Sequence, residues 1–453
     1  MLRETRKERE AHERKQQKQQ QPPQSHADSS DTARLRRENA QQRQQVEQLT
    51  EALATMQAAL QNMTLAQSTQ PQPQSRAAAH NDDDEKDTPP PLTAQTNGTA
   101  TTPVPASTAS SDSSPSPTLR RSLDVDSGYF GGYSTRHIHE LMLKDKHRTL
   151  SYQSFLYNNP QLLKDKVVLD VGCGTGILSL FAAKAGARLV VGVDAADIAD
   201  KAREIVKLNG YEGRVVIVKG KMEEVTLPVE KVDVIISEWM GYFLLYESML
   251  PSVLFARDRY LSNPAHCYPD VAVLHIAGMH DRRSQGEWVD WWKDVYGFDM
   301  TPLVTDADRH RGSSVEAIQP DDVVTSTCQL KRFDVGTVRA EELDWSSEFS
   351  VQLKAADSID ALVVHFDTLF QRDATERVTL TTSPATPATH WMQTVFRLHQ
   401  SVAGEAGEGM AGVMEAKRLK RYVRGYGVKL VYWKVDAAGK EVGQRFVQEY
   451  TIE

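Results

Sequence analysis

The densest group of residues that could bind a ligand spans positions 170–176, with the sequence Asp-Val-Gly-Cys-Gly-Thr-Gly. Glycines let the backbone turn tightly and approach a ligand closely. The glycine spacing is G-x-G-x-G, whereas dinucleotide-binding loops have G-x-G-x-x-G. An acid, Asp170, also stands two residues before Gly172. A carboxylate suits a cationic ligand better than a pyrophosphate, so this loop favours a ligand that carries a positive charge.

Further acids follow the next two apolar runs. Asp194 ends the first of these runs, where a carboxylate can accept hydrogen bonds from both hydroxyls of a ribose. Met222 and Glu223 follow the other run, and Glu223 could accept a hydrogen bond from an adenine amino group. Together these residues predict a site for S-adenosylmethionine, with Gly172 and Gly174 against the ligand. A nicotinamide dinucleotide site, or acids that only cap helices, are the alternatives.

A second acidic group lies in the segment 237–249, Ser-Glu-Trp-Met-Gly-Tyr-Phe-Leu-Leu-Tyr-Glu-Ser-Met. Glu238 and Glu247 stand nine residues apart and flank a turn at Gly241. Two such acids are usually solvated at a protein surface. Here they follow the end of an apolar run, and parallel α/β sheets bind ligands at the carboxyl ends of their strands. The pair is therefore a candidate ligand site.

The elements that must position these residues alternate between strands and helices up to about residue 261. Apolar β-branched runs predict four strands, over residues 166–170, 189–194, 215–218 and 232–236. Helices are expected between them, over residues 177–183 and 196–207. Continuous apolar strands separated by helices are typical of a parallel sheet covered on both faces. The sequence thus predicts a Rossmann-like α/β domain over residues 126–262.

The pattern changes after about residue 264. Polar and apolar residues alternate over 348–353 and 428–435, which indicates antiparallel strands. We therefore expect an antiparallel β-barrel domain over residues 263–453. The segment 284–320 interrupts it with closely spaced aromatic residues: Trp288, Trp291, Trp292, Tyr296 and Phe298. Exposed aromatics need a partner, although these could instead fill the barrel.

Residues 1–125 differ in composition from the rest of the chain. Every Phe, Trp and Tyr lies at or after Tyr129. A stretch without aromatics builds little core, so this region is predicted to be a disordered tail. Apolar residues from Val46 to Met63 follow spacings of three and four, which predicts a coiled coil over about 32–66. A lone, fluctuating helix is the alternative, because about three heptads are marginal.

Composition excludes several classes of protein. The net charge of −8 argues against general nucleic-acid binding, which needs a basic surface. Three widely spaced cysteines, Cys173, Cys267 and Cys328, predict neither a disulfide framework nor a Cys-rich zinc site, and no metal is expected. The polar start of the chain is not a secretory signal, and no apolar run could span a bilayer. We expect a cytoplasmic protein, with nuclear entry left open.

The segment 238–247 resembles the double-glutamate loop of the protein arginine methyltransferases. Similar motifs lie at 129–133 (Tyr-Phe-Gly-Gly-Tyr), at 138–145 and at 389–391 (Thr-His-Trp). These motifs are long and occur in the family's order. The sequence is therefore identified as a member of the type I protein arginine methyltransferases, most similar to the methyltransferase 3 branch of that family.

This resemblance implies transfer of methyl groups from S-adenosylmethionine to guanidino nitrogens of protein arginines, giving monomethyl and asymmetric dimethylarginine. A guanidinium is planar and always protonated, and two carboxylates can hold it bidentately. By resemblance, Glu238 and Glu247 would bind it. A pair formed by His390 and Asp145 would provide a route for the proton that is lost.

The resemblance also implies which residues surround the methyl donor. Arg148 would bind the donor's carboxylate and pair with the first glutamate of the loop. His139 and Met142 would lie along the donor, and Tyr129 and Tyr133 would fold over it as a lid. The segment 284–320 would be the dimerisation arm of a homodimer. The implied substrates are glycine/arginine-rich segments and a small-subunit ribosomal protein.

Several features depart from the family. Leu141 stands where a second glutamate is usual, and no cysteine precedes Cys173, so the zinc finger common in the methyltransferase 3 branch is not expected. The basic group at 417–421 reads as a solvated strand edge. A small-molecule or nucleic-acid methyltransferase would not need Glu238 and Glu247 together. A catalytically silent scaffold, the other alternative, would normally have lost Asp194, Glu238 or His390, and all three are present.

Overall fold

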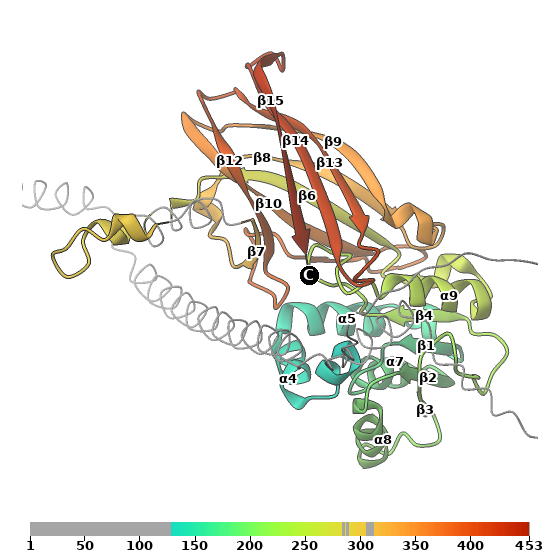
Figure 1. Ribbon diagram of the computed structural model, residues 1–453. Coiled ribbons are helices and arrows are strands. Elements are labelled where there is room, and N and C mark those ends of the chain that lie inside the picture. The colour runs from blue at the N-terminus through green and yellow to red at the C-terminus, as the bar shows by residue number, and fades with distance from the viewer. Residues whose placement is uncertain (1–127, 283–285, 287–289, 305–311, 453) are drawn as a thin grey trace, which may run out of the picture.

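The computed structural model describes residues 128–282, 286, 290–304 and 312–452. The expected tail and its coiled coil lie outside these residues. Figure 1 shows two bodies, an α/β domain and an antiparallel β domain that stands on it. None of the helices within the described ranges is long and apolar enough to cross a membrane.

The α/β domain is built on a parallel sheet with the strand order β3-β2-β1-β4-β5. Its strands are β1 (Val167–Val171), β2 (Leu189–Asp194), β3 (Val215–Lys219), β4 (Val234–Ser237) and β5 (Cys267–Tyr268). Its helices are α4 (Arg136–Lys144), α5 (Lys146–Asn158), α6 (Pro160–Leu163), α7 (Ile177–Lys184), α8 (Ile198–Leu208) and α9 (Leu250–Tyr260). Every residue of β1 and β4 is buried, as expected for a sheet covered on both faces. The Rossmann-like prediction is confirmed.

The parallel sheet extends slightly beyond the boundary expected at residue 262. β5 pairs in parallel with β4, through Ile235 opposite Cys267 and Ile236 opposite Tyr268. This strand could not be predicted from a residue pattern, because it has only two residues and follows a short 3-10 helix, η1 (Pro264–His266). The chain therefore enters the antiparallel domain after Tyr268.

The second domain contains two antiparallel sheets, as expected from the alternating pattern. One has the order β7-β12-β10-β6-β8 with β11 paired to β10, and the other has the order β15-β14-β13-β9. The strands are β6 (Val271–Met279), β7 (Ser313–Glu316), β8 (Val323–Asp334), β9 (Trp345–Gln352), β10 (Asp357–Phe370), β11 (Val378–Thr381), β12 (Gln393–Gly404), β13 (Gly409–Arg418), β14 (Tyr426–Val435) and β15 (Glu441–Ile452). The 3-10 helices η5 (Pro320–Asp322) and η6 (Ala340–Leu343) connect them.

Buried polar side chains join the two domains. Asn159, fully buried, donates to the carbonyl of Glu376 and accepts from the amides of Thr375 and Glu376. Arg257 of α9 donates to the carbonyls of Val335 and Val338 at 2.6 and 2.8 Å. Because such buried groups are costly to leave unpaired, these bonds fix the β domain over the α/β domain.

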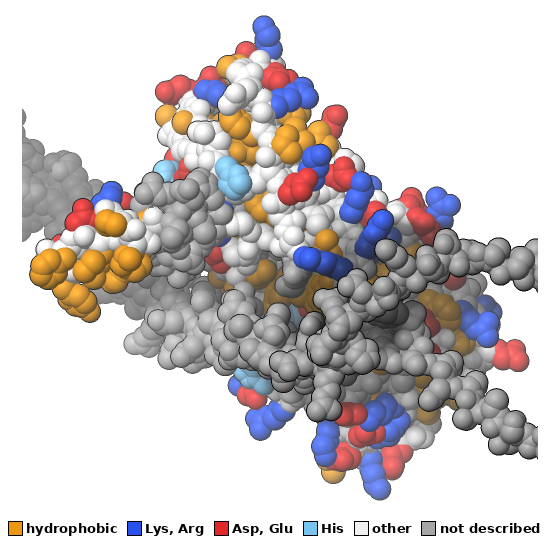
Figure 2. Space-filling model, in the orientation of Figure 1, with side chains coloured by type: hydrophobic (Ala, Val, Ile, Leu, Met, Phe, Trp, Pro, Cys, Tyr) orange, Lys and Arg blue, Asp and Glu red, His pale blue; other side chains and the backbone are white. Residues whose placement is uncertain are grey.

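The expected dimerisation arm projects away from both domains (Figure 1). Its described part contains the short 3-10 helices η3 (Asp290–Lys293) and η4 (Thr301–Leu303). Apolar side chains gather on its tip (Figure 2), and Tyr296 and Phe298 are 96% and 67% exposed. Trp291 does not fill the barrel, since its side chain is 51% exposed. The arm is shorter than the predicted 284–320, because residues 313–316 form β7 and pair with β12.

Candidate active site

The glycine-rich loop lies between β1 and α7, at the carboxyl edge of the parallel sheet. Gly172, Gly174 and Gly176 have φ values of +71°, +52° and +81°, a region that favours glycine. A Cβ atom at Gly172 would lie 2.2 Å from the Met249 side chain, and one at Gly174 would lie 3.3 Å from the His139 ring. The loop therefore needs glycine for its conformation, whereas the end of the flexible Met249 side chain can move.

Asp194 holds this loop from the end of β2. Its two carboxylate oxygens accept hydrogen bonds from the backbone amides of Gly174 and Ala196, each at 2.8 Å. Burial raises the pKa of Asp194, while these two bonds lower it. Each oxygen keeps a further lone pair, which suits the expected contact with ribose hydroxyls.

The other residues predicted to contact the methyl donor lie in different surroundings. Asp170 is fully buried in β1, where Oδ2 accepts from the hydroxyl of Ser179 at 2.7 Å, and burial raises its pKa to about 7. Met222 is buried in the core of the α/β domain. Glu223 accepts at 2.6 Å from Ser252 of α9. Direct contact of these three residues with the donor stays a prediction.

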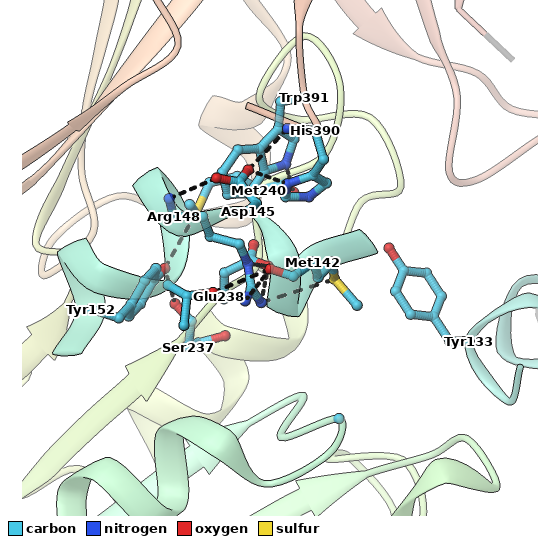
Figure 3. A network of polar contacts seen from close by, with 12 residues as sticks. Tyr133, Met142, Asp145, Arg148, Tyr152, Ser237, Glu238, Met240, His390 and Trp391 are labelled. Atoms are coloured by element: carbon cyan, nitrogen blue, oxygen red, sulfur yellow. Dashed lines mark hydrogen bonds and ion pairs between the residues drawn. The ribbon is translucent and has the colours of Figure 1, made fainter. Parts of the chain in front are cut away.

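Glu238 is held by the buried Arg148 of α5 (Figure 3). Both Nε and Nη2 of Arg148 donate to Oε2 of Glu238, at 2.9 and 2.7 Å, and each side chain is only 7% exposed. Burial lowers the pKa of Arg148, but the charge and hydrogen bonds of Glu238 raise it more, so the guanidinium stays charged. Met142 adds its carbonyl and its sulfur around the same guanidinium. The pairing expected from the sequence is present.

Asp145 connects this helix to the β domain. Its Oδ1 accepts from the amide of Arg148 at the start of α5, and its Oδ2 accepts from the amide and Nδ1 of His390 at 2.9 and 2.8 Å. Burial alone would raise the pKa of Asp145, but the bonds from His390 and Arg148 lower it. The next residue, Trp391, donates to the carbonyl of Met240 at 2.8 Å, so two neighbouring side chains of one loop dock on the α/β domain (Figure 3).

Glu247 has different partners. Tyr133 donates to its Oε2 at 2.6 Å, Tyr129 also bonds to it, and the Tyr129 and Tyr133 rings are 4.9 Å apart. Burial raises the pKa of Glu247 to about 7, and Glu238 raises it as well, while the tyrosine bonds and Arg424 lower it. The two tyrosines that were expected to cover the methyl donor therefore contact Glu247.

The double-glutamate loop is strained. Phe243, Leu244, Glu247 and Ser248 have φ values of +51°, +64°, +73° and +52°. Such left-handed residues cost about 1–3 kcal/mol each, and they persist where the surrounding structure fixes them. Gly241 is required at the turn, since a Cβ atom there would lie 1.9 Å from the carbonyl oxygen of Tyr246.

Sequence reasoning missed several residues that support this loop. Tyr152 donates to the carbonyl of Ser237 at 3.0 Å, and Thr394 of β12 accepts from the amide of Phe243 at 3.1 Å. Arg424, between β13 and β14, donates to the carbonyl of Glu247 at 2.7 Å. These residues lie far from the loop in sequence and belong to no spacing pattern, so only the fold reveals them.

The residues around the glycine loop fit S-adenosylmethionine. Oδ1 of Asp170 is buried without a hydrogen-bond partner among the described residues, which suits a donor group on a ligand. Asp194 presents carboxylate oxygens beside a loop whose positive φ values favour glycine. No cluster of metal-ligating side chains occurs within the described ranges.

Comparison with known proteins agrees with this geometry. Residues 270–437 match the family model of the arginine methyltransferase oligomerization subdomain, and residues 146–246 match that of the ribosomal protein L11 methyltransferase. The chain is 42% identical over 323 residues to protein arginine N-methyltransferase 1 of Saccharomyces cerevisiae, covering 71% of this chain and 92% of the relative. It is 45% identical over 289 residues to the enzyme of the same name from Schizosaccharomyces pombe, covering 64% and 84%.

Solved structures give the same result. The Trypanosoma brucei PRMT1 enzyme–prozyme heterotetrameric complex with AdoHcy contains a chain that is 43% identical, with a TM-score of 0.65 and coverage of 71% of this chain and 99% of that one. Arabidopsis thaliana protein arginine methyltransferase 10 is 31% identical, with a TM-score of 0.64 and coverage of 72% and 100%.

Fold and site together define a methyltransferase that uses S-adenosylmethionine as its methyl donor. The chain belongs to the protein arginine N-methyltransferase family, and its type I assignment agrees with the relatives named methyltransferase 1.

The raised pKa of Glu247 predicts how activity depends on pH. A protonated Glu247 is neutral and cannot pair with a guanidinium, so kcat/KM for an arginine peptide should fall as pH drops through about 7. At one pH unit below this pKa we expect about a tenfold loss. Steady-state rates between pH 5.5 and 9 measure it. A flat profile across pH 7 would contradict a role for ionised Glu247.

Proposed function

We propose that this protein converts arginine residues of other proteins to monomethyl and asymmetric dimethylarginine. The observation that carries the proposal is the pair of glutamates at the carboxyl edge of the parallel sheet, each held by its own donor. Arg148 binds Glu238 and Tyr133 binds Glu247. Methylation of protein arginine is the activity of the family, and the asymmetric product is our extension of it.

Each residue then has a defined role in the reaction. Glu238 and Glu247 bind the planar guanidinium of the substrate and localise electron density on one terminal nitrogen. S-adenosylmethionine supplies an electrophilic methyl group. The two carboxylates offset the repulsion between a cationic substrate and a cationic donor. Because both are oriented before the substrate arrives, positioning and electrostatics supply most of the acceleration.

The contact between Asp145 and His390 supports a role in proton removal. The methylated nitrogen must lose a proton, and the resemblance places His390 beside the substrate loop. Its Nδ1 is bound to Asp145 at 2.8 Å, which fixes the ring and leaves Nε2 for a proton. A structural role for His390, in docking the β domain on α5, is the competing account.

The partners follow from the same resemblance. We propose glycine/arginine-rich segments and a small-subunit ribosomal protein as substrates, a cytoplasmic location, and a place in the methyltransferase 3 branch. We also propose a homodimer that forms through the arm. The related Trypanosoma brucei enzyme assembles with a prozyme into a heterotetramer, and that assembly is the alternative.

Mass spectrometry of a glycine/arginine-rich peptide incubated with enzyme and donor tests the reaction. We expect monomethyl and then asymmetric dimethylarginine, identified by the loss of dimethylamine on fragmentation. Glu247→Gln should lower kcat by about 10²-fold, because it removes one preorganised charge. Donor affinity should barely change. Symmetric dimethylarginine would refute the proposed product, and near-normal turnover of Glu247→Gln would refute the role of the pair.

Deletion of the described arm residues 290–304 tests the assembly. The exposed aromatic side chains at the arm tip should anchor a second subunit, so the deletion should give monomers and weaken donor binding. Light scattering and a donor titration on one preparation measure both effects. A double substitution, Tyr296→Ser with Phe298→Ser, controls for misfolding. An unchanged dimer would place the interface elsewhere, and monomers with normal donor affinity would uncouple assembly from the site.

A further inference from the structure

Arg424 belongs to the connection between β13 and β14, in the C-terminal part of the chain, yet it contacts the double-glutamate loop through its backbone and its side chain. The amide of Glu247 donates to the carbonyl of Arg424 at 2.9 Å. The Nη1 atom of Arg424 donates back to the carbonyl of Glu247 at 2.7 Å. One residue therefore satisfies both peptide groups of Glu247.

This double contact occurs at one of the two strained pairs of residues in the loop. Glu247 and the following Ser248 both have positive φ values, +73° and +52°, which residues other than glycine rarely adopt. Such a conformation persists only when its surroundings fix it. The bonds from Arg424 hold the peptide groups on each side of the Glu247 Cα atom, and so they determine the direction in which its carboxylate leaves the backbone.

The guanidinium of Arg424 also contacts the segment that carries the two tyrosines. Its Cζ lies 3.6 Å from the centroid of the Tyr129 ring and 5.3 Å from that of Phe130. This is the geometry of a cation–π contact, which is strongest with desolvated partners. Tyr129 and Tyr133 both donate hydrogen bonds to the Glu247 carboxylate. Arg424 therefore contacts both the segment that carries these tyrosines and the backbone of Glu247.

A second contact joins the same connection to the loop. Tyr422 is hydrogen-bonded to Tyr246, which directly precedes Glu247. The turn itself is closed by a bond from the amide of Gly425 to the carbonyl of Tyr422 and by one from the amide of Leu419 to the carbonyl of Gly425. The connection between β13 and β14 therefore forms a hydrogen-bonded turn that contacts two neighbouring residues of the double-glutamate loop.

We propose that Arg424 is a positioning residue for the methyl transfer: it sets the backbone of Glu247 and seats the tyrosines that hold the Glu247 carboxylate. It acts through Glu247 and does not bind the substrate guanidinium. The inference rests on the proposed function, because Glu247 is taken as a substrate carboxylate. A general role in joining the two domains is the alternative, and the two accounts predict different measurements.

The test compares Arg424→Met and Arg424→Lys with Lys420→Met, an exposed cation on the same connection, as the matched control. Arg424→Met should lower kcat for an arginine peptide by about 10²-fold, since small misplacements near the chemistry have effects of this size. Its donor affinity should stay within about twofold of wild type, and its unfolding midpoint should move little. Lys420→Met should match wild type throughout.

The pH profile distinguishes positioning from general stabilisation. The titratable groups that interact with Glu247 are Glu238, Tyr242 and Tyr246 from its own loop, the two tyrosines of the N-terminal segment, and Arg424. Among these, Arg424 supplies the positive charge, so Arg424→Met should shift the acid limb of kcat/KM to higher pH. Arg424→Lys should restore the limb but only part of kcat, because lysine cannot reproduce the flat, forked contact.

Hydrogen–deuterium exchange gives a readout that does not need catalysis. Amides of residues 243–248 and 129–133 should exchange faster in Arg424→Met than in Lys420→Met, while those of β1 and β4 should not change. If wild type methylated no arginine peptide, the proposed function would fail, yet this exchange pattern would still support the positioning role. Two results for Arg424→Met would overturn the positioning role. One is a near-normal kcat with unchanged exchange, and the other is a loss of kcat that is explained entirely by a lower unfolding midpoint.

Discussion

The proposed site depends on two carboxylates, Glu238 and Glu247, that interact with each other while largely removed from water. A buried carboxylate costs several kcal/mol unless it is paired, and two of them also repel each other. The structure meets this constraint with a different partner for each acid. Arg148 neutralises Glu238 with a charged pair, whereas Glu247 receives neutral hydroxyl donors from Tyr129 and Tyr133. Because hydroxyls compensate burial only in part, the pKa of Glu247 stays raised to about 7.

Contacts between the two domains keep these partners of Glu238 and Glu247 in place. Arg148 is positioned by α5, whose first turn is capped by Asp145, and Asp145 is bound in turn by His390 of the β domain. The strained double-glutamate loop takes its support from the β domain as well, through Thr394 and the connection between β13 and β14. Glu238 and Glu247 therefore belong to the α/β domain, but their geometry depends on the antiparallel domain. The parallel-sheet domain alone would therefore lack the contacts that hold the two glutamates in position.

The elements that follow a local pattern could be predicted from the sequence. The strands at 189–194 and 215–218, the glycine loop and the acid at Asp194 are set by apolar runs and by neighbouring residues, and the structure has them where expected. Long-range contacts could not be predicted in this way. Arg424 lies 177 positions from Glu247 and stands next to a basic group that resembles a solvated edge. The two-residue strand β5 was equally hidden, because it forms only by pairing with β4.

The most direct test of the account compares the binding of two peptides that differ only in charge. One carries arginine and the other citrulline, its neutral counterpart of nearly the same shape, and both are titrated in the presence of S-adenosylhomocysteine. Wild type should prefer arginine by about 10- to 100-fold, as expected for hydrogen bonds to a charged group. Glu247→Gln should lose at least tenfold of this preference through weaker arginine binding alone. An undiminished preference for arginine in Glu247→Gln would contradict the claim that this carboxylate holds the substrate cation.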